Sequence, residues 1–149
     1  MVIGNGAIAS SFAAKYSNDD QVVIFASGVS NSKESDDSKF ERERKLVLSS
    51  LVQNPEKFFV YFSTCSVYDP CEKNSHYVRH KLAIEEIIQK NASKYLISRV
   101  SNVVCKTENK TTVFNFFVNN IRDGSPFKLW KNAYRNVIDV DDLLKTVKE

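Results

Sequence analysis

The sequence predicts an α/β protein in which helices cover both faces of a parallel sheet. Short apolar runs alternate with helical patterns along the chain. The runs are continuously apolar, as expected for strands that are buried on both faces of a sheet. The chain has 149 residues, of which 42% are apolar and 26% charged, as in an ordinary soluble globular domain. We therefore expect one domain over residues 1–149, arranged as a three-layer sandwich.

The chain opens with a short apolar strand over residues 1–3 and continues into a predicted helix over 7–16. Where the strand runs into the helix, Gly4, Gly6 and Ala9 place small residues at the first, third and sixth positions of the turn. Small residues there allow a tight turn and let a pyrophosphate approach the helix N-terminus. By itself the loop could equally be a plain strand-to-helix turn.

A second strand is predicted over residues 21–26, followed by a Ser/Asn/Asp-rich loop and a helix over 39–53. Pro55 follows the helix as a stop signal. The start of the helix, residues 40–45, is rich in charge and is interpreted as a solvated turn. The residues expected to face the sheet are Leu46, Val47, Leu48, Leu51 and Val52.

The third strand, over residues 58–63, leads to Thr64 and then to a helix predicted over 76–91. Tyr77 and Lys81 lie four residues apart and so share one face of that helix. A neighbouring ammonium should lower the pKa of the phenol and make it a general acid/base, with Thr64 orienting the substrate oxygen. The alternatives are an exposed helical pair and a strand-end threonine that bonds to local backbone.

The remaining elements are a strand over 95–99, a helix over 113–122, a further strand over 127–130 and a helix over 141–148. The aromatic residues of this part are interpreted as core. They are Phe114, Phe116, Phe117 and Trp130.

Four further segments carry a resemblance to a known family, and they follow each other in the family's order. They are residues 22–28, 62–68, 97–104 and 135–142. Together with the glycine loop and the Tyr77/Lys81 pair, they resemble the extended short-chain dehydrogenase/reductase superfamily, in its nucleotide-sugar epimerase/dehydratase branch. The resemblance implies a Rossmann-like fold.

The resemblance also implies roles for particular residues. Thr64, Tyr77 and Lys81 would be catalytic, and the substrate contacts would be Thr64, Asn102 and Arg135. The cofactor would be NAD or NADP, with no metal. Its contacts would be Gly4, Gly6, Ala7, Ile8, Ala26, Ser27, Tyr77 and Lys81.

The sequence departs from the family between the first helix and the second strand. Only residues 18–21 stand where family members place two more strand–helix units, so the parallel sheet should be reduced. In the family, the missing part supplies the residue that binds the adenosine ribose. Asp19 and Asp20 could replace it, but they are more simply interpreted as a solvated turn. A right-handed crossover from the first to the second strand would then require the first helix on the opposite face of the sheet from its usual place in the family. Otherwise the second strand takes a different position in the sheet, or this crossover breaks the right-handed rule.

The predicted function is that of a cytoplasmic NAD(P)-dependent epimerase or ketoreductase acting on a nucleotide-activated sugar, as in polysaccharide biosynthesis. Cys65 and Ser66 follow Thr64 where dehydratases of the family carry an acidic pair, so dehydration is not expected. The alternative is a catalytically degenerate subunit that binds a nucleotide or a partner. A third hypothesis is a homo-oligomer that completes the cofactor pocket from a neighbour.

Charge and composition argue against a nucleic-acid-binding, secreted, membrane-spanning or metal-binding protein. The net charge is +3, and the basic residues form no stripe with aromatics, so no nucleic-acid partner is expected. The sequence has neither a signal peptide pattern nor a membrane-length apolar run. The three cysteines lack metal-site spacing, and Cys65 is interpreted as a small buried residue instead of a proton donor. His80 is expected at the surface.

Overall fold

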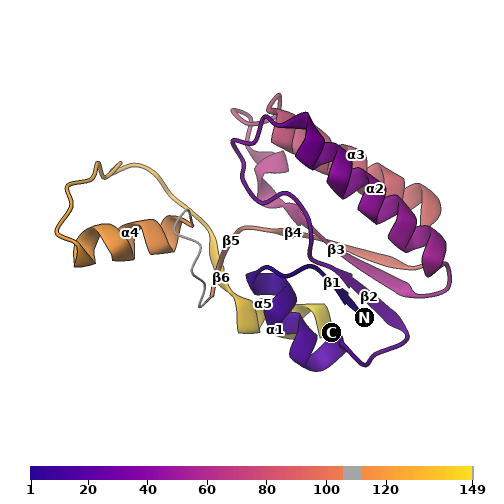
Figure 1. Cartoon of the computed structure of the whole chain (residues 1–149). Coiled ribbons are helices and arrows are strands. Elements are labelled where there is room, and N and C mark those ends of the chain that lie inside the picture. The colour runs from indigo at the N-terminus through magenta and orange to yellow at the C-terminus, as the bar shows by residue number, and fades with distance from the viewer. Residues whose placement is uncertain (106–111, 149) are drawn as a thin grey trace. The chain divides into compact units, whose positions relative to one another are not determined.

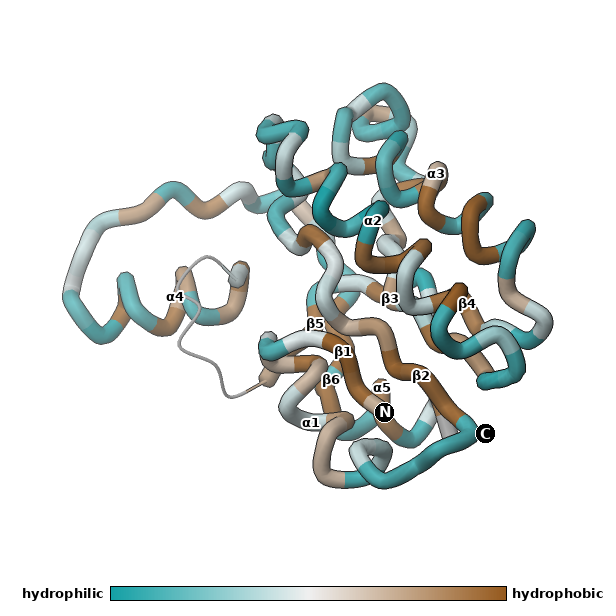
Figure 2. Tube along the Cα trace, turned by 45° about the vertical axis from the view of Figure 1, so that its right-hand side comes forward, coloured by the Kyte–Doolittle hydropathy of each residue, from teal (hydrophilic) through white to brown (hydrophobic). Residues whose placement is uncertain are grey.

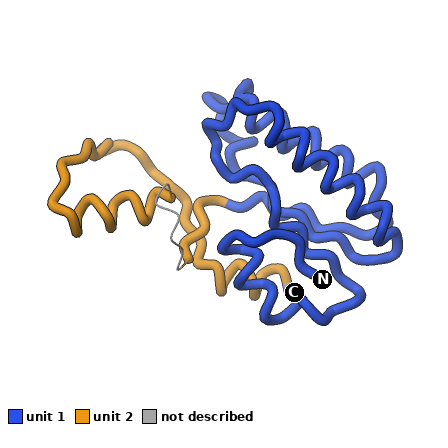
Figure 3. The backbone as a smooth tube through the Cα atoms, viewed as in Figure 1, with its two compact units in different colours: residues 1–100 blue, residues 101–149 orange. Residues whose placement is uncertain are grey.

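The computed structural model of the chain describes residues 1–105 and 112–148. It divides into two compact units, residues 1–100 and residues 101–149 (Figure 3). Each unit is described by itself.

The first unit is built on a four-stranded parallel sheet. The strands are β1 (Val2–Ile3), β2 (Val22–Phe25), β3 (Phe58–Thr64) and β4 (Tyr95–Val100). They lie side by side in chain order, β1-β2-β3-β4 (Figure 1). Val23 pairs with Phe59, and Tyr61 pairs with Ile97. The expected reduced parallel sheet is therefore confirmed.

Helices follow the strands, and polar side chains mark where two of them begin. The helices are α1 (Ala7–Tyr16), α2 (Asp37–Gln53) and α3 (His76–Asn91), with a 3₁₀ turn, η1, over Cys65–Tyr68. Asp36 accepts a hydrogen bond from the Ser38 backbone N–H at the start of α2, and Ser75 accepts one from Val78 at the start of α3. Such N-caps satisfy amides that the first turn leaves unpaired.

Apolar side chains on one face of the sheet form the main core of this unit. The cluster joins β2 and β3 to α2 and α3, and the hydropathy-coloured tube shows brown stretches along these strands and helices (Figure 2). Its buried members are Val23, Phe25, Val47, Leu51, Phe59, Tyr61, Ile84 and Ile88. Leu46 packs against this cluster, but Val52 is 79% exposed, so its predicted orientation was wrong.

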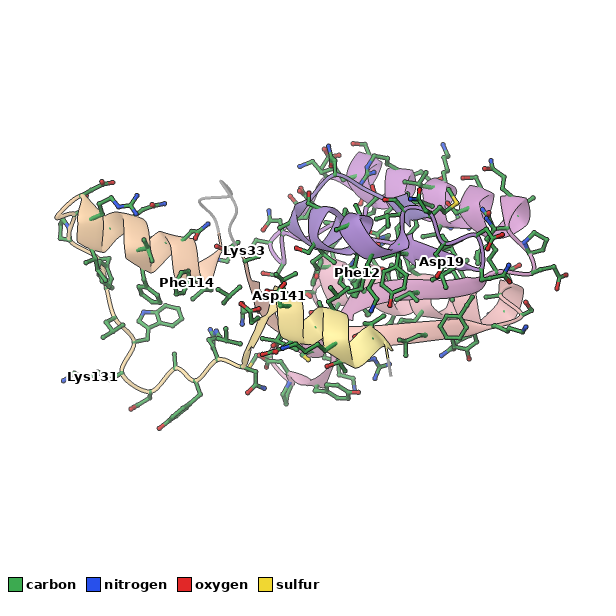
Figure 4. The ribbon with its side chains drawn as sticks, turned by 90° about the horizontal axis from the view of Figure 1, so that it is seen from below. Phe12, Asp19, Lys33, Phe114, Lys131 and Asp141 are labelled. Atoms are coloured by element: carbon green, nitrogen blue, oxygen red, sulfur yellow. The ribbon has the colours of Figure 1, made fainter. Side chains whose placement is uncertain are left out.

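The opposite face of the sheet is covered by α1. Phe12, labelled in Figure 4, is fully buried, and its ring centroid lies 5.2 Å from that of Phe62 on β3. Phe62 alternates with the Tyr61 side chain of the main core, so these two residues point to opposite faces. The unit therefore has the three layers that were expected.

The position of α1 answers the question of the first crossover. Each of the three crossovers steps to the next strand in the same direction, but α1 lies on the face opposite α2 and α3. The β1–α1–β2 crossover therefore has the opposite hand to the other two. Parallel crossovers are right-handed in the great majority of proteins. Either the β1–α1–β2 crossover or the two crossovers through α2 and α3 must therefore be left-handed.

The second unit contains a two-stranded parallel sheet and two helices. The elements are β5 (Asn102–Val104), α4 (Val113–Arg122), β6 (Val137–Asp139) and α5 (Val140–Lys148). The strand predicted over residues 127–130 is absent, because that segment is irregular. Trp130 is 73% exposed, and Phe114 (Figure 4) and Phe116 are also exposed, so their assignment to a core was wrong for this unit.

Candidate active site

The first pair of predicted site residues meets where β3 ends and α3 begins. Thr64 and Tyr77 are both 7% exposed, and the Thr64 side chain lies close enough to the phenol of Tyr77 to lower its pKa. Thr64 Oγ1 also accepts a hydrogen bond of 3.1 Å from the Ser66 backbone N–H, which fixes the start of η1. The threonine thus lies beside Tyr77 and also makes the local backbone bond that was its structural alternative.

The phenol of Tyr77 does not have the lowered pKa that the sequence suggested. Burial raises the pKa of Tyr77, the hydrogen bond with Thr64 lowers it, and the charge of Glu43 raises it further. The net shift is upward, because burial disfavours the charged phenolate. The expectation of a phenol activated by Lys81 was therefore wrong for this structure, and the raised pKa means that the Tyr77 phenol keeps its proton at neutral pH.

Lys81 lies on the same face of α3 as Tyr77, but its ammonium has other partners. The side chain is 2% exposed, and Nζ donates to Glu43 Oε1 at 3.0 Å and to the Tyr61 hydroxyl at 3.1 Å. Nζ lies 5.8 Å from the centre of the Tyr77 ring. Burial lowers the pKa of Lys81, while the charge of Glu43 raises it. The helical spacing therefore brings the two side chains together without joining their polar atoms.

Glu43 is the functional candidate that the sequence interpretation missed. Its side chain is fully buried, so the expected solvated turn at the start of α2 was wrong at this position. Burial by itself would raise the pKa of this carboxyl, but the bond to His80 and the charge of Lys81 lower it to about 2. Phe40, Glu43 and Val47 share one helix face by their spacing, and that periodicity was the signal available in the sequence.

His80 also differs from expectation. Its side chain is 10% exposed, and Nε2 lies 3.0 Å from Glu43 Oε2. The imidazole packs on the ring of Phe40, with 4.6 Å between the ring centroids. The surface position predicted for His80 was therefore wrong, because α2 covers this part of α3.

The glycine loop has the geometry that a pyrophosphate site needs. Gly4 has a φ of +130°, and a Cβ there would lie 2.4 Å from the Ala26 carbonyl oxygen, so the fold itself requires glycine. Gly6, in contrast, has open space around the position of a Cβ. Gly6 is also the N-cap of α1 and provides no side-chain cap to the helix N-terminus. The loop therefore fits the diphosphate of a dinucleotide at the amides of Ala7 and Ile8.

Two further cofactor candidates follow β2 and border the same loop. Ala26 donates its backbone N–H to the Ile3 carbonyl at 2.8 Å and lies against Gly4. Ser27 receives two hydrogen bonds from Arg42, one to its carbonyl at 2.8 Å and one to its hydroxyl at 3.2 Å. The structure thus brings Gly4, Ala26 and Ser27 together.

The predicted substrate contacts in the second unit lie close in that unit. Asn102 Nδ2 donates to the Asn136 carbonyl at 3.0 Å, next to Arg135 in sequence. The Arg135 guanidinium donates to the Tyr134 carbonyl at 2.9 Å, and both Asn102 and Arg135 are exposed. The Arg135 guanidinium forms no ion pair in the part of the chain that the structure describes.

Cys65 and the two aspartates between the first helix and the second strand have structural partners. Cys65 Sγ donates to the Arg99 carbonyl at 2.9 Å. Asp19 and Asp20 accept hydrogen bonds from Gln21, as expected for a solvated turn. Over residues 1–105 and 112–148, no cluster of three or more His, Cys, Asp or Glu side chains could hold a metal ion. No helix in these ranges is both long and apolar enough to span a bilayer.

Solved structures with this fold include enzymes in complex with NAD. WbmH from Bordetella bronchiseptica, in complex with NAD+, matches with 20% identity and a TM-score of 0.70, over 96% of this chain and 54% of that chain. UDP-glucuronic acid 4-epimerase from Bacillus cereus, in complex with UDP-glucuronic acid and NAD, matches with 16% identity and a TM-score of 0.68, over 97% and 52%. The capsular polysaccharide assembling protein CapF from Staphylococcus aureus matches with 18% identity and a TM-score of 0.61, over 86% and 35%.

These similarities show a Rossmann-like fold, and the chain spans 35% to 54% of the length of these proteins. The sequence matches no curated protein. It does match the family described as NAD dependent epimerase/dehydratase, over residues 7–148. The predicted cofactor, NAD or NADP, agrees with that description, and the resemblance inferred from the motifs is confirmed. The chain therefore belongs to the NAD dependent epimerase/dehydratase family.

Proposed function

We propose that the chain forms an NAD(P)-binding domain, with a minimal C-terminal substrate-binding part, that epimerises or reduces a nucleotide-activated sugar in the cytoplasm. The observation that carries the proposal is the juxtaposition of the buried Thr64 and Tyr77 side chains, with Lys81 one helical turn away. This arrangement provides a proton donor and a hydroxyl at one end of a parallel sheet, where ligands of open α/β folds bind.

The glycine loop supports the choice of cofactor. When bound, NAD(P) supplies the hydride acceptor or donor that an epimerase or a ketoreductase needs. Gly4, Gly6 and the first amides of α1 would hold its diphosphate, with Ala26 and Ser27 beside them. Lys81 would need to turn its ammonium from Glu43 toward the ribose hydroxyls.

Tyr77 would exchange a proton with the reacting sugar oxygen, while Thr64 holds that oxygen in place. Because the pKa of Tyr77 is raised, the phenol carries its proton at neutral pH. The proton-donating direction should therefore be independent of pH near neutrality, and proton abstraction from a hydroxyl should accelerate as the pH rises.

A nucleotide-activated sugar is favoured by the residues of the second unit and by a structural neighbour. Asn102 and the Arg135 guanidinium are exposed, and they offer amide and bidentate donors to a diphosphate. One neighbour was solved with UDP-glucuronic acid, and another is a capsular polysaccharide assembling protein, which favours a role in polysaccharide biosynthesis. A thermal-shift panel of nucleotide sugars would identify the ligand.

The test is substitution of Tyr77 by Phe, with Tyr95→Phe as the control. Tyr95 lies on β4, is 41% exposed, and has no place in the proposed site. Fluorescence titration with NADH and NADPH measures binding, and chromatography of products measures turnover on a nucleotide-sugar panel. We expect Y77F to bind cofactor normally and to lose about 10²-fold or more of turnover. Turnover that is equal in Y77F and Y95F would refute the proposed role.

A second candidate is a degenerate subunit that binds a nucleotide or a partner without turnover. The raised pKa of Tyr77 and the attachment of Lys81 to Glu43 favour it. Absence of NADH and NADPH binding at every accessible concentration would support this subunit over the enzyme. Sedimentation with and without cofactor would test the further proposal of a homo-oligomer that completes the pocket.

A further inference from the structure

The carboxylate of Glu43 connects four parts of the first unit at one buried point. Oε2 accepts from the Val29 backbone N–H at 2.6 Å and lies 3.0 Å from His80 Nε2. Oε1 accepts from the Tyr61 hydroxyl at 2.7 Å and from Lys81 Nζ at 3.0 Å. The loop after β2, strand β3 and helix α3 are thus all bonded to one side chain of α2.

The loop after β2 lies directly on this pair of opposite charges. A Cβ at Gly28 would be 2.6 Å from Lys81 Nζ and 2.8 Å from Glu43 Oε1. Gly28 therefore lets the backbone approach the ion pair with no space for a side chain between them. Lys81 and Glu43 are 2% and 0% exposed, so the ammonium and the carboxylate are shielded from water.

The surroundings of Lys81 offer it few other charges. Tyr61 of β3 and Tyr77 of its own helix present aromatic faces to Nζ, at 5.0 and 5.8 Å from the ring centroids. Glu85, one turn further along α3, acts on Lys81 only at longer range, because its carboxylate is bonded to Ser63 and Arg99. Glu43 is therefore the counter-ion in direct contact with Lys81.

We propose that Glu43 is a positioning residue for the Tyr77–Lys81 pair. Its carboxylate holds the Lys81 ammonium beneath Gly28, 5.8 Å from the centre of the Tyr77 ring, and its charge keeps a proton on both Tyr77 and Lys81. This inference rests on the proposed function for its consequence in catalysis. Its electrostatic content concerns the protein alone and needs neither cofactor nor substrate.

The physical reason is the sign of the charge. An anion in direct contact with Lys81 and near Tyr77 makes removal of a proton from either group less favourable. The two groups lie close enough to titrate as a coupled pair, so the quantity to measure is the pH at which the pair loses its first proton. Replacing the carboxylate by a neutral amide of the same shape should lower that pH, whichever of the two groups loses its proton first.

The test compares Glu43→Gln with Glu43→Asp, in the full chain without ligand. Carbon-13 labels at tyrosine Cζ and lysine Cε report the two ionisations by NMR, and Y77F and Lys81→Met assign the signals. We expect the first deprotonation of the pair at lower pH in E43Q than in the unchanged protein. E43D, which keeps the charge, should titrate close to the unchanged protein, whereas a merely structural role would leave the midpoint of both variants unmoved.

Gly28→Ala provides a second route if E43Q does not fold. The added methyl group would displace the ammonium from the carboxylate while leaving Glu43 in the chain, and it should also lower the pH of first deprotonation. Equal midpoints in the folded variants and the unchanged protein would overturn the inference. If turnover exists, its alkaline limb should move with the NMR midpoint in E43Q. If turnover is present but its alkaline limb does not move in E43Q, the proposed role of Glu43 is rejected and the enzyme proposal stands. If the midpoint is lowered but no turnover is found, the charge role of Glu43 is supported and the enzyme proposal fails.

Discussion

The stability that Glu43 gives to the folded chain should depend on pH in a way that one substitution isolates. In the folded protein the pKa of this carboxyl is lowered from its ordinary 4.5 to about 2. A lowered pKa means that the folded state binds the proton more weakly than the unfolded state. The contribution to stability is therefore complete above about pH 4.5 and is lost as the pH falls toward 2.

The magnitude follows from the difference between the two pKa values. At about 1.4 kcal/mol per pH unit, the ionised carboxylate contributes roughly 3 kcal/mol to the free energy of unfolding at neutral pH. About 2 kcal/mol of this should be lost by pH 3, since the unfolded chain is then largely protonated at this position. The side chain is fully buried, so solvent screening reduces the figure little.

The assay is urea unfolding of the unchanged protein and of E43Q at pH 7 and pH 3. E43Q should be less stable at pH 7, and the stability difference between the two proteins should shrink by about 2 kcal/mol at pH 3. Glu41→Gln is the matched control, because Glu41 lies on the same helix, 47% exposed, in weak pairs with Arg44 and Lys45. A difference between the unchanged protein and E43Q that is the same at both pH values would refute the reasoning.

Further predictions concern the glycine loop and the two faces of the sheet. Gly6→Ala should fold normally, because its Cβ meets open space, but weaken NADH binding about tenfold or more in a fluorescence titration, as the methyl group blocks the diphosphate. Gly4→Ala should lower the urea midpoint, because its Cβ would meet the Ala26 carbonyl at a φ of +130°; equal stability of the two variants would contradict this. Phe12→Ala should cost about 3–5 kcal/mol of unfolding free energy, since the ring is fully buried. The exposed Phe114→Ala should change the free energy by less than about 1 kcal/mol, and a similar loss for both would argue against the α1 layer.

Local patterns determined where the helices and strands of the first unit lie. The predicted helices over 7–16 and 76–91 agree with α1 and α3 at both ends, and α2 begins two residues before its predicted start. These features depend on capping residues and on apolar runs, which are properties of neighbouring residues. The same holds for Tyr77 and Lys81, because a separation of four residues sets the shared helix face wherever the helix packs.

The strands of the second unit were less predictable, because a strand depends on pairing with a segment that local patterns do not reveal. The apolar run over residues 127–130 reads as a strand, but no neighbouring strand pairs with it in the described part of the chain. A strand is stabilised by hydrogen bonds to another segment, and a single run of side chains cannot reveal whether that segment is present. Instead, β5 and β6 pair across 32 intervening residues at positions that showed only weak strand patterns.

The sequence by itself determined the order of the elements of the first unit, the glycine loop, the placement of Thr64 at the end of a strand, and the common helix face of Tyr77 and Lys81. Only the tertiary structure decided the face of the sheet that α1 covers and the partner of the Lys81 ammonium. It also decided the direction in which the pKa of Tyr77 shifts. Those outcomes depend on burial and on charges brought close from distant parts of the chain: Glu43 lies 38 residues before Lys81, and only the packing of α2 against α3 makes the two side chains meet.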